Sequence, residues 1–156
     1  MVSIEAALSG AVSRWNAGDL DGYLELYDDT VKLHGYSAKP MDKVAVVRHY
    51  RKVWAALAVD GSPNPRLDIK DALSDGNRLA CRFLMSGIHR GTFMGFPATG
   101  RPYLYQGITL MRFTGQRVVE RWSITDALNQ LIQIDTLCST NKSGEGNIVP
   151  RKTHSF

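Results

Sequence analysis

Asp126 has both a residue type and a position that suit proton transfer. It follows a strand-like run over residues 117–125 and shares the alternation of Trp122 and Ile124. If that face of the strand lines a hollow, apolar walls leave the carboxyl group poorly hydrated. Its pKa then rises toward the range in which a general acid or base works best. An aspartate directly before a helix is also a favoured N-cap, so a purely structural role is an equal alternative to the catalytic role that we predict.

His89 is the second residue that could transfer a proton. It ends an alternating segment in which Phe83 and Met85 share its parity, so it closes an apolar face. An imidazole there can donate a hydrogen bond to a substrate oxygen or carry a proton. The alternative is a histidine satisfied by backbone groups of the glycine-rich loop that follows. We predict a catalytic role for His89 and a substrate contact for His34, which ends a short strand and can reach the same rim.

The remaining candidates would bind substrate. Tyr105 and Gln106 have opposite parity, so only one of them can face the hollow. A bulge near the turn at Thr114 and Gly115 would exchange the two, and both stay candidates. The predicted substrate-binding residues are His34, Phe93, Tyr105, Gln106, Arg112 and Trp122. The histidines lack the spacing of metal ligands, so no metal site is predicted.

The composition is that of one globular domain. The chain has 156 residues, 44% of them hydrophobic, and a formal net charge of +4. Its basic residues are scattered and no nucleic-acid motif accompanies them, so nucleic acid is not an expected partner. The N-terminus has no signal-like segment and no apolar run is long enough to cross a bilayer, so we expect a cytoplasmic protein without a membrane partner. The two cysteines indicate free thiols rather than a disulfide framework.

The periodicity changes once along the chain, from helical to strand-like. The predicted elements are helices over 4–17, 20–27 and 41–58 with a short strand over 31–34, then strands over 66–73, 78–89, 103–113 and 117–125, then a helix over 126–134. Helices segregated from an antiparallel sheet indicate an α+β domain. Glycines within long strands indicate strong curvature, which leaves a conical hollow under the helices. We predict a single domain over residues 1–135 and a flexible polar tail over 136–156.

Two segments resemble motifs of a known family. Gly87 to Arg101 reads GIHRGTFMGFPATGR and resembles the GxHxGxFxGxPxTGR segment of the SnoaL-like polyketide cyclases, also called ester cyclases. Arg112 to Asp126 looks like their C-terminal motif, which ends in E-x-W-x-x-x-D. The early segment Trp15 to Leu20 fits as well, so the resemblance spans about residues 4–135.

The resemblance implies a fold and a function. The fold would be a cystatin-like, cone-shaped α+β barrel, with a strongly curved, mostly antiparallel sheet packed against three N-terminal helices, and it would form a homodimer or homotetramer. The activity would be acid/base catalysis without a cofactor, closing a ring by intramolecular aldol condensation of a small hydrophobic oxygenated substrate. Asp126 matches the family's catalytic aspartate, and Arg112 stands where an assisting histidine is found. Isomerisation, dehydration, epoxide opening and non-catalytic ligand binding are the alternatives, because one fold hosts many functions.

Overall fold

The computed structural model of the chain describes residues 3–59 and 61–133. The predicted tail over 136–156 lies outside the described residues. The elements in chain order are α1 (Ile4–Asn16), α2 (Leu20–Leu24), β1 (Tyr27–His34), α3 (Lys43–Ala56), β2 (Leu57–Ala58), β3 (Arg66–Asp75), β4 (Arg78–His89), β5 (Pro102–Thr114), β6 (Arg117–Thr125) and α4 (Ala127–Gln133).

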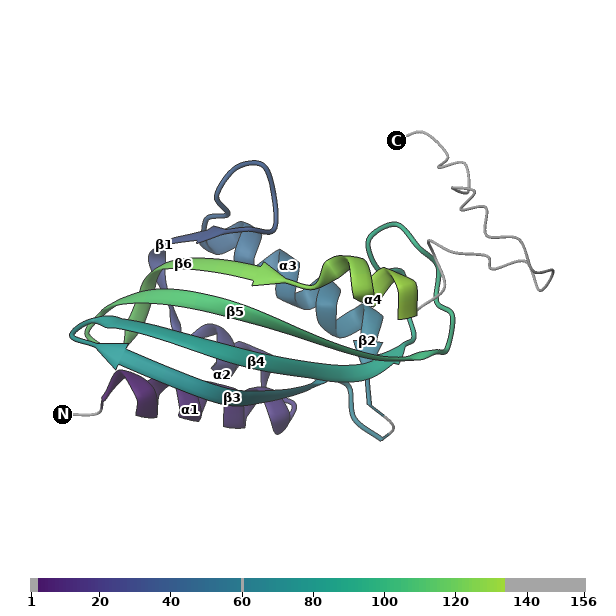
Figure 1. The fold of residues 1–156 in the computed structure, drawn as a ribbon, viewed down its shortest axis with the longest axis horizontal. Helices are drawn as coiled ribbons and strands as arrows, with labels where there is room; N and C mark the ends of the chain where they lie inside the picture. The colour runs from purple at the N-terminus through teal and green to yellow at the C-terminus, as the bar shows by residue number, and fades with distance from the viewer. Residues whose placement is uncertain (1–2, 60, 134–156) are drawn as a thin grey trace.

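The strands form one sheet in the order β1-β6-β5-β4-β2, and β3 also pairs with β4. All neighbouring strands are antiparallel except β1 and β6, which are parallel. Helices α1, α2 and α3 cover one face of the curled sheet, and α4 continues from the end of β6 (Figure 1). The predicted α+β class, with a curved sheet packed against three N-terminal helices, is confirmed.

The helices begin where the sequence supplies caps. Ser3 accepts a hydrogen bond from the Ala6 amide at 3.2 Å, and Asp42 accepts one from the Ala45 amide at 2.9 Å. The second helix is shorter than its pattern predicts, because Tyr27 opens β1 and pairs with Val118 of β6. Tertiary pairing therefore overrides the local helical periodicity at this point.

One face of α3 packs into the core. Val44 is 65% exposed, whereas Val46, Tyr50 and Val53 are buried. These three recur at intervals of three and four residues, as one face of a helix does. His49 lies beside this stripe and is partly buried.

The strands β4, β5 and β6 approach one another closely at Gly107. A Cβ atom on Gly107 of β5 would lie 2.6 Å from the Phe83 ring and 2.8 Å from the Ile124 carbonyl oxygen. Glycine therefore lets the Phe83 ring pack directly on the backbone of β5. This packing forms the concave side of the sheet, which faces the helices.

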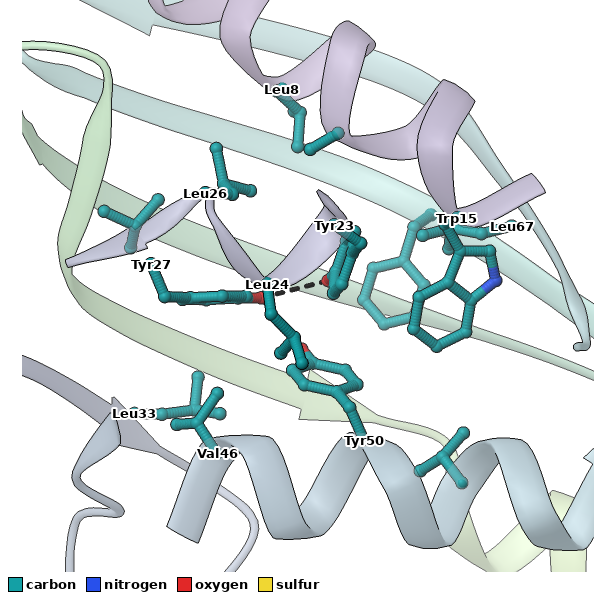
Figure 2. Packing of buried hydrophobic residues seen from close by; sticks show 14 of the residues in the cluster. Leu8, Trp15, Tyr23, Leu24, Leu26, Tyr27, Leu33, Val46, Tyr50 and Leu67 are labelled. Atoms are coloured by element: carbon teal, nitrogen blue, oxygen red, sulfur yellow. Dashed lines mark hydrogen bonds between the residues drawn. The ribbon is translucent and has the colours of Figure 1, made fainter. Parts of the chain in front are cut away.

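Aromatic side chains fill the space between the helices and the sheet. Trp15 is fully buried, packs edge-on against Tyr23 and Tyr50, and donates from its indole nitrogen to the Pro65 carbonyl at 2.7 Å. Tyr23, Tyr27 and Tyr50 come from α2, β1 and α3 and point toward one another (Figure 2). The core thus brings three phenolic hydroxyl groups to one place.

Candidate active site

A cavity lies on the concave side of the sheet, beneath α1 and α3. Its inner part has a volume of about 40 Å³ and most of its lining is apolar, including Phe83, Met85 and Tyr105. A wider mouth of about 580 Å³ lies next to it, lined partly by the loop that follows β4. The inner cavity and the mouth share four lining residues: Tyr36, His49, Val53 and Tyr105. A small molecule can therefore place its body in the mouth and one end in the inner cavity.

Arg121 of β6 brings a positive charge to the inner cavity. Its side chain lines the cavity although the residue is only 7% exposed. Nε donates to the hydroxyl oxygens of Thr109 at 2.8 Å and Ser123 at 3.0 Å. Nη1 donates to the hydroxyls of Tyr50, at 2.8 Å, and Tyr27. These bonds fix the guanidinium group in one orientation.

Among the described residues, no carboxylate balances this charge. Within residues 3–59 and 61–133, neither the cavity nor its mouth is lined by an aspartate or glutamate, and Arg121 takes part in no ion pair. Arginine stays protonated in proteins, so the charge persists even in this buried position. An isolated buried charge is costly, which makes the site receptive to an anion.

The tyrosines around Arg121 stay neutral. The Tyr23 and Tyr27 hydroxyl oxygens lie 3.0 Å apart, and those of Tyr27 and Tyr50 lie 2.9 Å apart (Figure 2). Burial raises the pKa of Tyr27 and of Tyr50, and the lowering effect of Arg121 does not offset it. The phenols therefore solvate the guanidinium group without neutralising it.

His49 of α3 is the histidine among the four residues that line both the cavity and its mouth. Burial, with smaller effects of Arg121 and Lys52, lowers its pKa from 6.5 to about 4. Its ring packs against the rings of Tyr36, at 4.8 Å, and Tyr50, at 5.3 Å. No hydrogen bond from another described residue reaches its ring nitrogens. A neutral imidazole is thus free to accept a proton from a bound molecule.

Tyr36 reaches the cavity because of the glycine before it. Gly35 has a φ of 100°, and a Cβ there would lie 2.0 Å from the Ser123 carbonyl oxygen. Only glycine allows the chain to pass this close to β6 in that conformation. The turn directs the following Tyr36 into the wall shared by cavity and mouth.

The predicted inward orientation of Asp126 is wrong. Trp122 and Ile124 share its face and are 39% and 81% exposed, and Asp126 is exposed beside them on the outer side of the sheet. Its carboxylate accepts from the Asn129 amide at 3.1 Å, as an N-cap of α4 does. These contacts support the structural alternative rather than proton transfer inside the cavity.

A β-bulge explains the reversed face. Phe113 pairs with Val118 but Arg112 pairs with Glu120, so Val119 is an extra residue in β6. Alternation counted from the buried Val118 therefore gives the wrong face for every later residue of the strand. Arg121 and Ser123 face inward instead.

His89 is buried but lines neither the cavity nor its mouth. The residue is 0% exposed, and its Nδ1 lies 3.1 Å from the Thr99 hydroxyl oxygen. Its backbone N–H donates to the Arg101 carbonyl, and its carbonyl accepts from the Gly100 amide. The backbone of His89 therefore ties down the glycine-rich loop, whereas its ring contacts the Thr99 side chain and its buried Nε2 has no partner among the described residues. The catalytic role of His89 stays an untested prediction.

The other candidates divide between the two faces. Tyr105 lines the cavity and Phe93 lines the mouth, whereas Gln106 is exposed on the outer face. His34 and Arg112 are also outside the cavity and share one partner: Glu120 Oε1 lies 3.1 Å from His34 Nε2, and Glu120 Oε2 accepts from Arg112 at 2.6 Å. The inward orientation assumed for Trp122 is wrong for the same reason as that of Asp126, and its indole stacks on the His34 ring at 5.2 Å.

Sequence reasoning missed Arg121, His49 and Tyr36 as site residues. The sequence does indicate the position of His49, because this residue neighbours the buried stripe of Val46, Tyr50 and Val53 on α3. No sequence pattern indicates that Arg121 faces inward, because its orientation depends on the bulge. Among the described residues no cluster of histidine, cysteine and carboxylate side chains could hold a metal ion.

Comparisons with known proteins agree with this architecture. The profile of the family described as SnoaL-like polyketide cyclase matches residues 6–134, and the chain belongs to that family. None of the curated protein sequences matches the chain significantly. No described helix is both long and apolar enough to span a membrane.

Several solved structures share the fold. AclR from Streptomyces galilaeus is 22% identical with a TM-score of 0.76, and the match covers 86% of this chain and 97% of AclR. IdmH from Streptomyces antibioticus, described as a candidate polyketide cyclase, is 26% identical with a TM-score of 0.70, covering 85% and 98% of the two chains. A SnoaL-like polyketide cyclase from Agrobacterium tumefaciens is 21% identical with a TM-score of 0.70, covering 86% and 99%.

Proposed function

We propose that the protein is a cofactor-independent enzyme that moves a proton next to a carbonyl group of a small, apolar, oxygenated molecule. The observation that carries this proposal is the pairing, in one cavity, of a neutral His49 with a buried, uncompensated Arg121. One group accepts a proton and the other stabilises the negative charge that its removal creates.

The first step would form an enolate. His49 takes a proton from the carbon next to the carbonyl, and the electron pair of that C–H bond moves onto the carbonyl oxygen. Arg121 lines the same cavity and would donate a charge-assisted hydrogen bond to this oxygen, and the apolar walls would strengthen the attraction. Because the guanidinium group is already fixed by four hydroxyls, little reorganisation is needed as the charge develops.

The second step would return the proton. In an intramolecular aldol closure the enolate carbon attacks a second carbonyl of the same molecule, and the new alkoxide takes the proton from His49. Burial, with a smaller effect of Arg121, lowers the pKa of His49, so the imidazolium gives the proton up readily. No atom is gained or lost, and membership of the polyketide cyclase family favours ring closure over the related reactions.

Isomerisation or dehydration would use the same two groups. Epoxide opening would need Asp126 to work with a second carboxylate. It is disfavoured, because Glu120, the nearby acidic residue in the sequence, binds Arg112 and His34 away from the cavity. A non-catalytic ligand-binding protein is the remaining alternative.

The test is exchange of solvent deuterium into the methylene group of an aryl 1,3-diketone, followed by NMR. The wild-type protein should accelerate exchange, and His49→Gln should reduce the rate by roughly 10²- to 10⁴-fold. Arg48→Gln, a change on the exposed side of the same helix, is the matched control. Exchange no faster with the wild-type protein than with buffer would favour the ligand-binding alternative.

We also propose that the outer face of the sheet joins copies of the chain into a homodimer or homotetramer. Apolar side chains are exposed together on this face of β5 and β6: Leu104, Ile108, Leu110, Trp122 and Ile124. An exposed apolar patch of this kind marks an association surface.

A further inference from the structure

We propose that the inner end of the cavity is a binding site for one anionic oxygen. The substrate is then a carbon acid with an acidic enol, and Nη2 of Arg121 holds the oxygen of its enolate, or of a phenolate that resembles the enolate. The inference rests on the proposed function and narrows its substrate class. It follows from which guanidinium donors are free, and from the size of the cavity that Arg121 lines.

Three of the five N–H groups of Arg121 are already used. The single Nε–H is shared between Thr109 and Ser123, and the two Nη1–H groups point to Tyr27 and Tyr50. No acceptor for Nη2 is found among residues 3–59 and 61–133. Both N–H groups of Nη2 are therefore left for a ligand.

This pattern selects against carboxylates. A carboxylate prefers two parallel hydrogen bonds from neighbouring guanidinium nitrogens. At Arg121 both such pairs contain a nitrogen, Nε or Nη1, that is committed to protein hydroxyls. A phenolate or enolate needs only one oxygen beside Nη2, so it keeps the full charge attraction without displacing Thr109 or Tyr50.

The shape of the cavity also favours a single ionised oxygen on a flat ring. The inner part, about 40 Å³, has room for little more than one polar atom and its first neighbours. Beyond it the apolar walls of Phe83, Met85 and Tyr105 lead to the mouth of about 580 Å³. A flat ring can follow these walls outward while its ionised oxygen stays at Arg121.

The weak basicity of His49 fits an acidic substrate. With a pKa of about 4, the imidazole takes protons efficiently only from a carbon acid whose anion is unusually stable. An anion on Arg121 would also offset the charge that lowers the pKa of His49. Binding should therefore raise the His49 pKa, which gives a readout independent of turnover.

The experiment titrates the protein with 4-nitrophenol, whose ionised form absorbs visible light. The bound ligand should be ionised at a pH where the free ligand is mostly neutral. It should bind at least roughly tenfold more tightly than 4-nitrobenzoate, which is similar in size and charge. Arg121→Met should weaken nitrophenolate binding by roughly 10- to 100-fold. Arg117→Met removes the same charge from an exposed position of the same strand and should leave binding unchanged.

The comparison of the two ligands in the wild-type protein needs no variant, so it decides the matter even if Arg121→Met does not fold. Nitrobenzoate binding as tightly as nitrophenolate, or nitrophenol bound as the neutral phenol, would overturn the inference. Nitrophenolate binding with no deuterium exchange would support this subsite and overturn the enzyme instead. Deuterium exchange without a preference for nitrophenolate over nitrobenzoate would support the enzyme and overturn this subsite.

Discussion

Glu120 and Arg121 are neighbours in the chain, yet their side chains lie on opposite sides of β6. Glu120 is bound to Arg112 and His34 away from the cavity, while Arg121 is buried among hydroxyl groups beneath the helices. The nearest carboxylate in sequence is therefore turned away from the guanidinium group by the alternation of the strand. This separation leaves the cavity positively charged.

Turnover should depend on the neutral form of His49. Because its pKa is about 4, the rate constant kcat/KM should be flat near neutral pH and fall as pH drops through about 4. A pH profile of deuterium exchange measures this. An inflection near 6.5, the ordinary histidine value, would contradict the assignment.

The same histidine should make the fold sensitive to acid. The unfolded chain binds a proton at His49 near pH 6.5 and the folded chain only near pH 4, so unfolding is favoured as pH falls between these values. The contribution of His49 to the free energy of unfolding should drop by roughly 3 kcal/mol across this window and be constant above it. Burial lowers the pKa of His89 as well, which adds to the effect. Urea titrations at several pH values check this, and His49→Gln should remove most of the slope.

Tyr50→Phe should destabilise the protein by about 1–3 kcal/mol, because it leaves one N–H of the buried Arg121 without an acceptor. Tyr23→Phe is the matched control: its hydroxyl bonds Tyr27 and not Arg121, so its loss should cost less. Chemical denaturation of both variants measures the difference. Equal losses would mean that the guanidinium group does not depend on Tyr50.

Asp126→Asn should retain deuterium exchange within a small factor of the wild-type rate. An asparagine oxygen can still accept from the Asn129 amide, so the cap is kept while the acid is removed. Asp126→Ala should lower the free energy of unfolding by about 1 kcal/mol. A large loss of exchange in Asp126→Asn alone would restore the catalytic role that the sequence predicts.

Ile124→Lys should weaken self-association without unfolding the chain, since this side chain is 81% exposed on the proposed interface. Leu73→Lys, at a position 79% exposed on β3, is the matched control and should leave the assembly intact. Light scattering after size-exclusion chromatography measures the mass. A wild-type monomer at all concentrations would disprove the interface.

The sequence predicts most of the fold but only part of the site. The strands Arg78–His89 and Pro102–Thr114 follow from their strict alternation, and the burial of Tyr105 agrees with one of the two parities considered. The predicted second helix, over 20–27, is longer than the observed helix. Pairing with β6 stabilises Tyr27 more than a further turn of helix would. Local patterns carry no information about such distant partners.

The site is harder to predict because it depends on one irregularity. Only pairing with β5 shows that Val119 is an extra residue, and that residue decides whether Arg121 or Asp126 faces the cavity. Alternation along β6 alone assigns the wrong face. The burial of a lone guanidinium group is equally hard to predict, because arginine side chains lie mostly on the surface of folded proteins.

The extra residue in β6 also bears on how such a chain can change its chemistry. Deleting Val119 would exchange the inner and outer faces of the rest of β6. The cavity would then be lined by Trp122 and Asp126 in place of Arg121, and the order of the strands would stay the same. Deletion of this one residue would thus change the charge of the pocket from positive to negative without changing the fold.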